Sequence, residues 1–140
     1  MNRSAAHSLP PSIMPGIAWS FFDGEVFADP AEFNERVRER QEDVGAEEPW
    51  EPARVVLPAP RVRITYFGVV SPDDDEYTEM SVELASDDRA QFTAGELLFK
   101  INNAVAAHLR GVDHCYFEGL TISAPPAGDD PPVYEMHQGS

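Results

Sequence analysis

Cysteine and positive charge are both scarce in this sequence. A single cysteine among 140 residues excludes an internal disulfide and a zinc site built from several cysteines. Ten lysine and arginine residues stand against 25 aspartate and glutamate residues, so the formal net charge is −15. Charge of this sign repels nucleic-acid phosphates and anionic membrane surfaces, and it attracts basic partners. We therefore expect neither a nucleic-acid partner nor a membrane partner, although solubility alone also accounts for the charge.

Long apolar runs and catalytic motifs are missing as well. No stretch approaches the ~20 apolar residues that cross a bilayer, and the first eleven residues lack the apolar core of a secretory signal. The simplest expectation is a cytoplasmic location. The sequence has no P-loop, dinucleotide fingerprint, nucleophile elbow or metalloprotease motif. We expect a protein that is not an enzyme and that uses no cofactor and no metal.

The strongest structural pattern that is present runs from residue 92 to residue 122. Thr93 and Glu96 have the spacing of a capping box, in which two side chains satisfy backbone N–H groups at a helix start. Apolar residues then recur at helical spacing, and Gly111 suits the left-handed closing position. This pattern predicts a main helix over residues 93–110.

A second helix is predicted over residues 30–44. Asp29 is suited to cap it, Pro30 fits the first turn, where no donor is needed, and Gly45 ends it. Its apolar stripe is thin and consists of Phe33, Val37 and Val44. Because most of its other side chains are charged, we expect this helix to lie on the surface, held by few contacts.

Short runs of β-branched and aromatic residues predict the strands. They occupy residues 17–22, 62–70, 78–85, 115–122 and 133–137. From residue 62 onward the order is strand, strand, helix, strand, strand, with short connections within each strand pair. The sequence therefore predicts an α+β fold, in which an antiparallel sheet of about four to five strands carries the main helix on one face. Residues 1–15 are expected to form a flexible tail, and residues 16–140 a single domain.

Two finer expectations concern the direction of side chains. Alternation along residues 115–122 places Glu118 on one face with Tyr116, Leu120 and Ile122, and Phe117 on the opposite face with Cys115 and Thr121. On the main helix, Asn102 and Asn103 are expected to face solvent.

Few side chains favour a catalytic interpretation. His114 and Cys115 are adjacent on a strand and point to opposite faces, so the histidine cannot activate the thiol, and a buried structural cysteine is favoured. His108, Asp113 and His114 match no metal motif. A partly buried Glu118 leaves an alternative open: a small enzyme or ligand-binding domain with a pocket between helix and sheet, near Glu118 and His114.

The acidic side chains are the remaining feature. Residues 23–51 hold eleven carboxylates against three arginines. Exposed carboxylates beside an aromatic side chain form a typical protein-binding patch, because aromatic anchors tend to dominate interface energy. The predicted partner-binding residues are Glu35, Glu39, Glu42, Asp43, Glu47, Glu48, Trp50, Asp73, Asp74, Asp75 and Glu76. For Trp50 two positions are open: it fills the edge of the core, or it lies exposed.

The segment F-T-A-G-E-L-L-F-K-I-N-N-A-V, with the later D-H-C-Y-F-E-G-L, resembles small bacterial proteins encoded beside polymorphic or type VI secreted toxins. The resemblance covers about residues 60–140. Such proteins are cognate immunity proteins, which are small, acidic and cytosolic and which block the toxin by binding it. The resemblance implies a cognate toxin domain as the partner and assigns no functional residue. A homodimeric structural or adaptor protein, joined through an exposed edge strand, is a further alternative.

Overall fold

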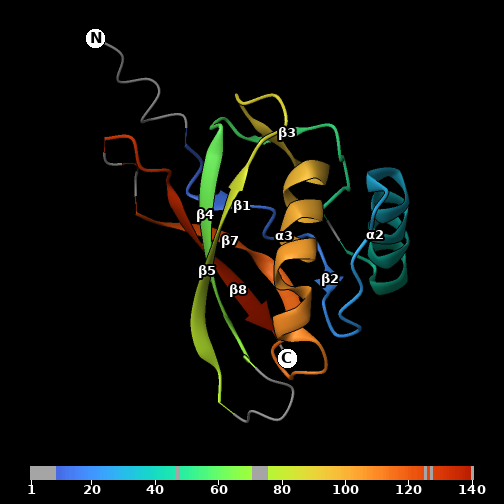
Figure 1. Cartoon of the computed structure of the whole chain (residues 1–140). Coiled ribbons are helices and arrows are strands. Elements are labelled where there is room, and N and C mark those ends of the chain that lie inside the picture. Colours follow the sequence, from blue (N-terminus) through green and yellow to red (C-terminus); the bar gives the residue numbers. More distant parts are fainter. Residues whose placement is uncertain (1–8, 47, 71–75, 125, 127, 140) are drawn as a thin grey trace.

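A mixed sheet and two helices form the fold of the described residues, which are 9–46, 48–70, 76–124, 126 and 128–139 of a computed structural model (Figure 1). Helix α3 (Ala94–Leu109) lies against one face of the sheet, and α2 (Pro30–Val44) packs on the far side of α3 (Figure 1). The larger sheet contains β1 (Ser12–Ile13), β2 (Trp19–Ser20), β4 (Arg61–Gly68), β5 (Thr78–Ala85), β7 (Tyr116–Ala124) and β8 (Val133–Gly139). A two-stranded sheet joins β3 (Val55–Leu57) to β6 (Phe92–Thr93). The predicted α+β class is confirmed.

The order of strands in the larger sheet is β1-β7-β8-β4-β5, and β2 also pairs with β7. The β4–β5 and β7–β8 pairs are antiparallel, as their short connections predict. Strand β8, however, runs parallel to β4, with Thr65 opposite Glu135. The expectation of a purely antiparallel sheet is therefore wrong. Short connections determine each hairpin locally, whereas the way two hairpins join is decided by their packing on α3.

Helix α3 begins as its cap predicts. The Thr93 hydroxyl accepts a hydrogen bond from the Glu96 backbone N–H at 3.2 Å. The Glu96 carboxylate does not return this bond but accepts from the Asp87 N–H and lies 2.9 Å from Lys100 Nζ. The fully buried apolar face of α3 includes Leu97, Leu98, Ile101, Val105 and Leu109. These residues form one core with Ile64 of β4 and Tyr134 of β8, so α3 is the centre of the fold.

The segment before residue 16 is not a loose tail over residues 9–15. Ser12 and Ile13 pair with β7, and the Ile13 side chain is 2% exposed. The Tyr134 hydroxyl donates to the Pro10 carbonyl oxygen at 2.6 Å. Prolines interrupt regular structure but leave their carbonyl groups available, so they did not prevent two residues from covering the edge of β7. Residues 1–8 lie outside the described part of the chain.

Strand β7 departs from the predicted alternation at Gly119. The pairing register with β8 shifts between Phe117 and Leu120, and Gly119 has a φ of +97°. This β-bulge adds one residue to the strand, so Phe117 and Leu120 both become buried. The expectation that they occupy opposite faces is wrong. Glu118 is exposed and points away from the core.

Replacing Gly119 with alanine is expected to lower the free energy of unfolding by about 3 kcal/mol, because a strained φ and a steric clash combine. A Cβ atom there would lie 2.7 Å from the Cα atom of Pro15. Gly111→Ala is the matched control, since Gly111 also has a positive φ, of +71°, but has no atom within 4 Å of an added Cβ. The control is expected to cost about 1 kcal/mol. Urea denaturation measures both, and equal losses would contradict the role of the close contact.

Candidate partner-binding surface

Helix α2 forms the outer layer of the molecule on one side, and a short list of contacts holds it there. Its buried residues are Phe33, Val37 and Gln41. The Gln41 side chain accepts from the Ala18 N–H at 2.8 Å and donates to the Val37 carbonyl oxygen at 2.9 Å. These hydrogen bonds of the buried Gln41 amide lie on the inner face of α2. The opposite face of α2 is free to carry charge.

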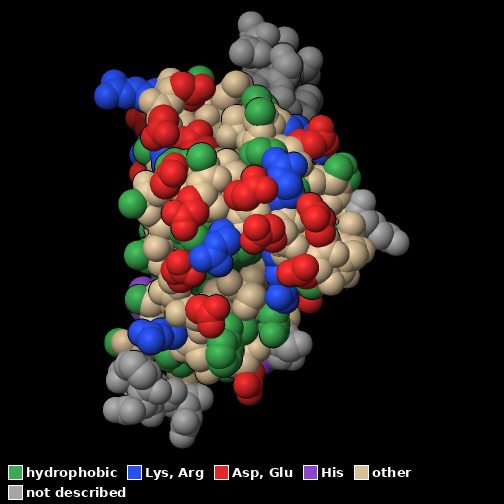
Figure 2. All heavy atoms as spheres, turned by 90° about the vertical axis from the view of Figure 1, so that its right-hand side faces the viewer, with side chains coloured by type: hydrophobic (Ala, Val, Ile, Leu, Met, Phe, Trp, Pro, Cys, Tyr) green, Lys and Arg blue, Asp and Glu red, His purple; other side chains and the backbone are tan. Residues whose placement is uncertain are grey.

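The free face of α2 is acidic. Figure 2 shows carboxylate side chains spread over the side of the molecule on which α2 lies, with a few arginines among them. The predicted residues Glu35, Glu39, Glu42 and Asp43 are all exposed there. Of these four, Glu35 lies 3.7 Å from Arg38, and the other three have no ion pair with any described residue. Surface carboxylates that pair with no cation of their own chain can pair with a cationic side chain of another protein.

The remaining predicted residues have different positions. Glu48 is half-buried and accepts from the Gly16 N–H at 2.9 Å. Trp50 is 9% exposed and its indole N–H donates to the Asn34 carbonyl oxygen at 3.2 Å, so it fills the edge of the core and offers no exposed anchor. Burying this large ring removes its apolar surface from water, and this favours the buried position over the exposed one. Glu76 is exposed, and Glu47, Asp73, Asp74 and Asp75 lie outside the described residues.

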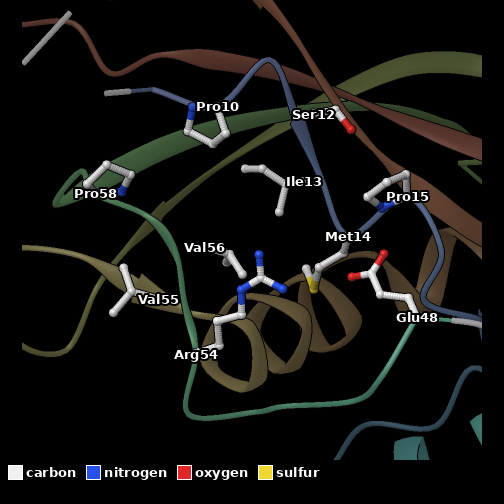
Figure 3. Close-up of a pocket in the computed structure, with 10 residues that line it drawn as sticks. All are labelled: Pro10, Ser12, Ile13, Met14, Pro15, Glu48, Arg54, Val55, Val56 and Pro58. Atoms are coloured by element: carbon white, nitrogen blue, oxygen red, sulfur yellow. The ribbon is translucent and has the colours of Figure 1, made fainter. Parts of the chain in front are cut away.

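A hollow of about 490 Å³ adjoins Glu48 (Figure 3). The segment of residues 10–15 forms one side of it, and residues 54–58 form the other. Ile13 and Val56 supply apolar surface, while the Glu48 carboxylate and the Arg54 guanidinium stand on different walls (Figure 3). This hollow offers charges of both signs beside apolar surface but no base adjacent to a nucleophile. It suits binding better than catalysis.

Glu118 and His114 do not share a pocket. Glu118 lines a hollow of about 230 Å³ with Arg40 and Tyr116, while His114 lines a separate one of about 400 Å³ with Phe67. The space between α3 and the sheet is filled by the apolar core. The single pocket expected between helix and sheet is therefore wrong for the described residues. The bulge at β7 and the packing of α3 explain why, since Glu118 points away from the helix.

Asn102 and Asn103 do not face solvent, as the helix pattern suggested. Asn102 is 1% exposed; its side-chain oxygen accepts from the Trp19 indole at 3.0 Å, and its amide donates to the Glu25 carbonyl oxygen. Asn103 accepts from the Phe27 N–H and donates to the Phe27 carbonyl oxygen. Both therefore position the segment that leads into α2. Two adjacent asparagines are unusual inside a helix, because this side chain competes for backbone groups, and that was the available signal.

Cys115 is buried, and burial raises the pKa of its thiol. His114, its neighbour, is exposed, so the two side chains lie in different environments. The prediction of a buried cysteine is confirmed. His108, the other histidine near this end of α3, forms a 2.8 Å hydrogen bond through Nδ1 with the Tyr66 hydroxyl. His108 is therefore held against Tyr66 of β4 at this end of α3.

The thiol of Cys115 is expected to react with Ellman's reagent about a hundredfold more slowly in the native chain than in the unfolded chain. A raised pKa and burial both lower the concentration of accessible thiolate. Absorbance at neutral pH, with and without urea, measures the two rates. His114→Ala should leave the native rate unchanged, and a rate that depends on His114 would indicate an activated nucleophile after all.

Two further kinds of feature, a metal-binding cluster and a membrane-spanning helix, are absent from the described residues. No three histidine, cysteine, aspartate or glutamate side chains among them come together as a group that could hold a metal ion. None of the described helices has the length and hydrophobicity to cross a membrane. The chain matches no protein-family model, and searches of the curated proteins and of the solved structures found no match either. The surface of the molecule is therefore the feature that remains to indicate a function.

Proposed function

We propose that this chain is an immunity protein that neutralises a cognate secreted toxin by binding it through the acidic face of α2. One observation supports this most: Glu39, Glu42 and Asp43 are exposed on α2 and have no ion pair with any described residue. A basic surface on a partner could pair with them without breaking an interaction of the free chain. The resemblance of residues 60–140 to immunity proteins of polymorphic and type VI toxins points in the same direction.

The net charge of −15 indicates which toxins such a surface suits. An enzyme that acts on a polyanion, such as a nuclease, carries cationic side chains around its substrate groove. Carboxylates on an inhibitor imitate the substrate and raise the association rate by about tenfold to a thousandfold. A toxin of this kind would be inhibited in the cytoplasm of the producing cell before secretion.

The face is also presented without much reorganisation. Asp29 caps α2 by accepting from the Ala31 N–H at 3.0 Å, and Gly45 closes it with a φ of +66°. Phe33 and Gln41 hold the inner side. A surface that is already ordered loses little conformational entropy on binding, which favours a tight complex.

Co-expression tests this proposal directly. The toxin encoded by the gene adjacent to this one is produced in a bacterial host, with and without the present chain. Protection of growth is expected, as is a stoichiometric complex with an inactive form of the toxin in gel filtration. Loss of growth in both cultures, together with separate elution of the two proteins, would show that the proposal is wrong.

A homodimeric adaptor protein is the alternative that a feature of the sheet favours. Strand β5 (Thr78–Ala85) is the last strand of the larger sheet and pairs, among the described strands, with β4 alone. An eight-residue edge can pair with the same strand of a second copy. Light scattering distinguishes the two functions, because the adaptor requires a dimer and the inhibitor does not.

A further inference from the structure

The sheet has a second surface, on the side away from α3. Ile64 and Tyr134 are buried in the core with α3, and neighbouring residues of a strand point to opposite faces. Thr65 and Glu135, which are paired in the register of β4 and β8, therefore share the face away from α3. No described helix covers this face, and α2 lies on the other side of the molecule (Figure 1).

A hollow of about 400 Å³ opens at one end of this face. Two aromatic rings line it and remain accessible: Phe67 is 44% exposed and Tyr77 is 37% exposed. His114 packs beside Tyr77, with ring centroids 5.4 Å apart, and its backbone N–H donates to the Tyr77 hydroxyl. Accessible aromatic rings that are already held in position form a binding surface of low entropic cost.

Gln138 holds the walls of this hollow together. Its side-chain oxygen accepts from the Phe67 N–H, and its amide donates to the carbonyl oxygens of Phe67 and His114 at 2.8 and 2.9 Å. These bonds continue the β4–β8 pairing beyond its last paired residues. The strand end that carries Phe67 is thus tied to the loop that carries His114, so the hollow is preformed.

Glu135 supplies the charge of the hollow. Its side chain is half-buried, lines the hollow, and has no hydrogen bond or ion pair with another described residue. The arginines of the same face do not neutralise it: Arg61 and Arg63 both bind Glu83, at 3.0 and 3.2 Å. Because Glu135 pairs with no described cation, an incoming cation could bind it without breaking an ion pair of the described residues.

We infer that this hollow binds one guanidinium group, presented by an arginine side chain of a partner protein. The rings of Phe67 and Tyr77 attract a cation through their faces, and the Glu135 carboxylate can accept two parallel N–H bonds. A planar, weakly hydrated guanidinium satisfies both requirements better than an ammonium group. Unlike the proposed toxin contact, this site does not involve α2, and it does not depend on the partner being a toxin.

The probe for this site is N-acetyl-arginine amide at millimolar concentration, with N-acetyl-citrulline amide as the neutral analogue of nearly the same shape. Titration of the ¹⁵N-labelled chain is followed by NMR. The arginine derivative is expected to shift the backbone signals of Phe67, Tyr77, Glu135 and His137 in a saturable way. The citrulline derivative is expected to shift them little, because it lacks the charge.

Two substitutions test whether the arginine derivative binds in this hollow. Glu135→Gln should weaken binding of the arginine derivative about tenfold, which is the loss of one charged hydrogen-bonded pair. Glu118→Gln removes the same charge from a different hollow, so it should leave the affinity unchanged. Thermal unfolding of each variant verifies that it is folded.

The inference is wrong if both derivatives bind equally, if neither binds, or if Glu118→Gln weakens binding as much as Glu135→Gln. The last result would mean that the probe responds to the overall negative charge rather than to the hollow. None of these results bears on the co-expression experiment. A chain that protects against the toxin yet binds no arginine derivative would retain the proposed function and lose only this site.

Discussion

Phe33→Ala is expected to lower the free energy of unfolding by about 3–5 kcal/mol, the largest loss for a single substitution that we predict here. Phe33 is fully buried, and its ring lies 5.0 Å from the ring of Trp19, 5.2 Å from Phe27 and 5.6 Å from Phe99, all edge-to-face. Removing it leaves a cavity and three unsupported rings. Because Phe33 and Val37 are the only buried apolar side chains of α2 among its described residues, the loss also loosens the acidic face.

Urea denaturation followed by circular dichroism measures this loss. Phe22→Ala serves as the control. Phe22 is also a phenylalanine and precedes α2 in the chain, but its side chain is 52% exposed. The control should change the free energy of unfolding by no more than about 0.5 kcal/mol. Natural domains have a stability of about 5–15 kcal/mol, so the Phe33 variant should unfold at markedly lower urea. A loss below about 1 kcal/mol would contradict the central position given to this ring.

Reversing the charge of α2 is expected to weaken toxin binding by about tenfold to a thousandfold. The variant carries Glu35→Lys, Glu39→Lys, Glu42→Lys and Asp43→Lys. The loss should fall mainly on the association rate, because exposed charges steer the encounter more than they hold the complex. For the same reason, the affinity of the natural chain should decrease with added salt, and that of the variant should change much less.

The matched control carries the reversals Glu79→Lys, Asp113→Lys, Asp129→Lys and Asp130→Lys. Both variants contain four reversals of exposed residues, so they have the same net charge. Surface plasmon resonance against the immobilised toxin, over a range of salt concentrations, compares them. If the control loses as much affinity, net charge rather than the face of α2 governs binding. A version with Gln and Asn in place of Lys separates repulsion from loss of attraction, and thermal unfolding verifies each variant.

Local patterns were sufficient to predict both helices. The expected range 30–44 agrees with α2 at both ends, because Asp29 and Gly45 act on adjacent backbone groups. The main helix was expected over residues 93–110 and covers Ala94–Leu109. Caps and apolar spacing are properties of neighbouring residues, so the sequence contains them directly. The position of four acidic residues on a surface helix follows from the same pattern.

Contacts between segments that are distant in the sequence explain the predictions that were wrong. Pro15 lies against the bulge at Gly119, and the positions of Asn102 and Asn103 depend on hydrogen bonds with the segment of residues 19–27. Neither neighbour can be identified from periodicity. Trp50 had two possible positions in the sequence, and the packing beneath α2 selected the buried one. The hollow between Phe67 and Glu135 likewise requires the parallel pairing of β4 with β8.

By itself, the sequence determined two capped helices, most of the strands, an excess of negative charge and an acidic outer helix. These follow from hydrogen-bonding and hydrophobic patterns within a few residues of each other. Only the tertiary structure decided that β8 runs parallel to β4, that Ser12 and Ile13 join the sheet, and which of the described carboxylates pair with no described cation. The physical reason is that these properties depend on which segments meet across the fold, and many low-energy pairings are compatible with one pattern of residues.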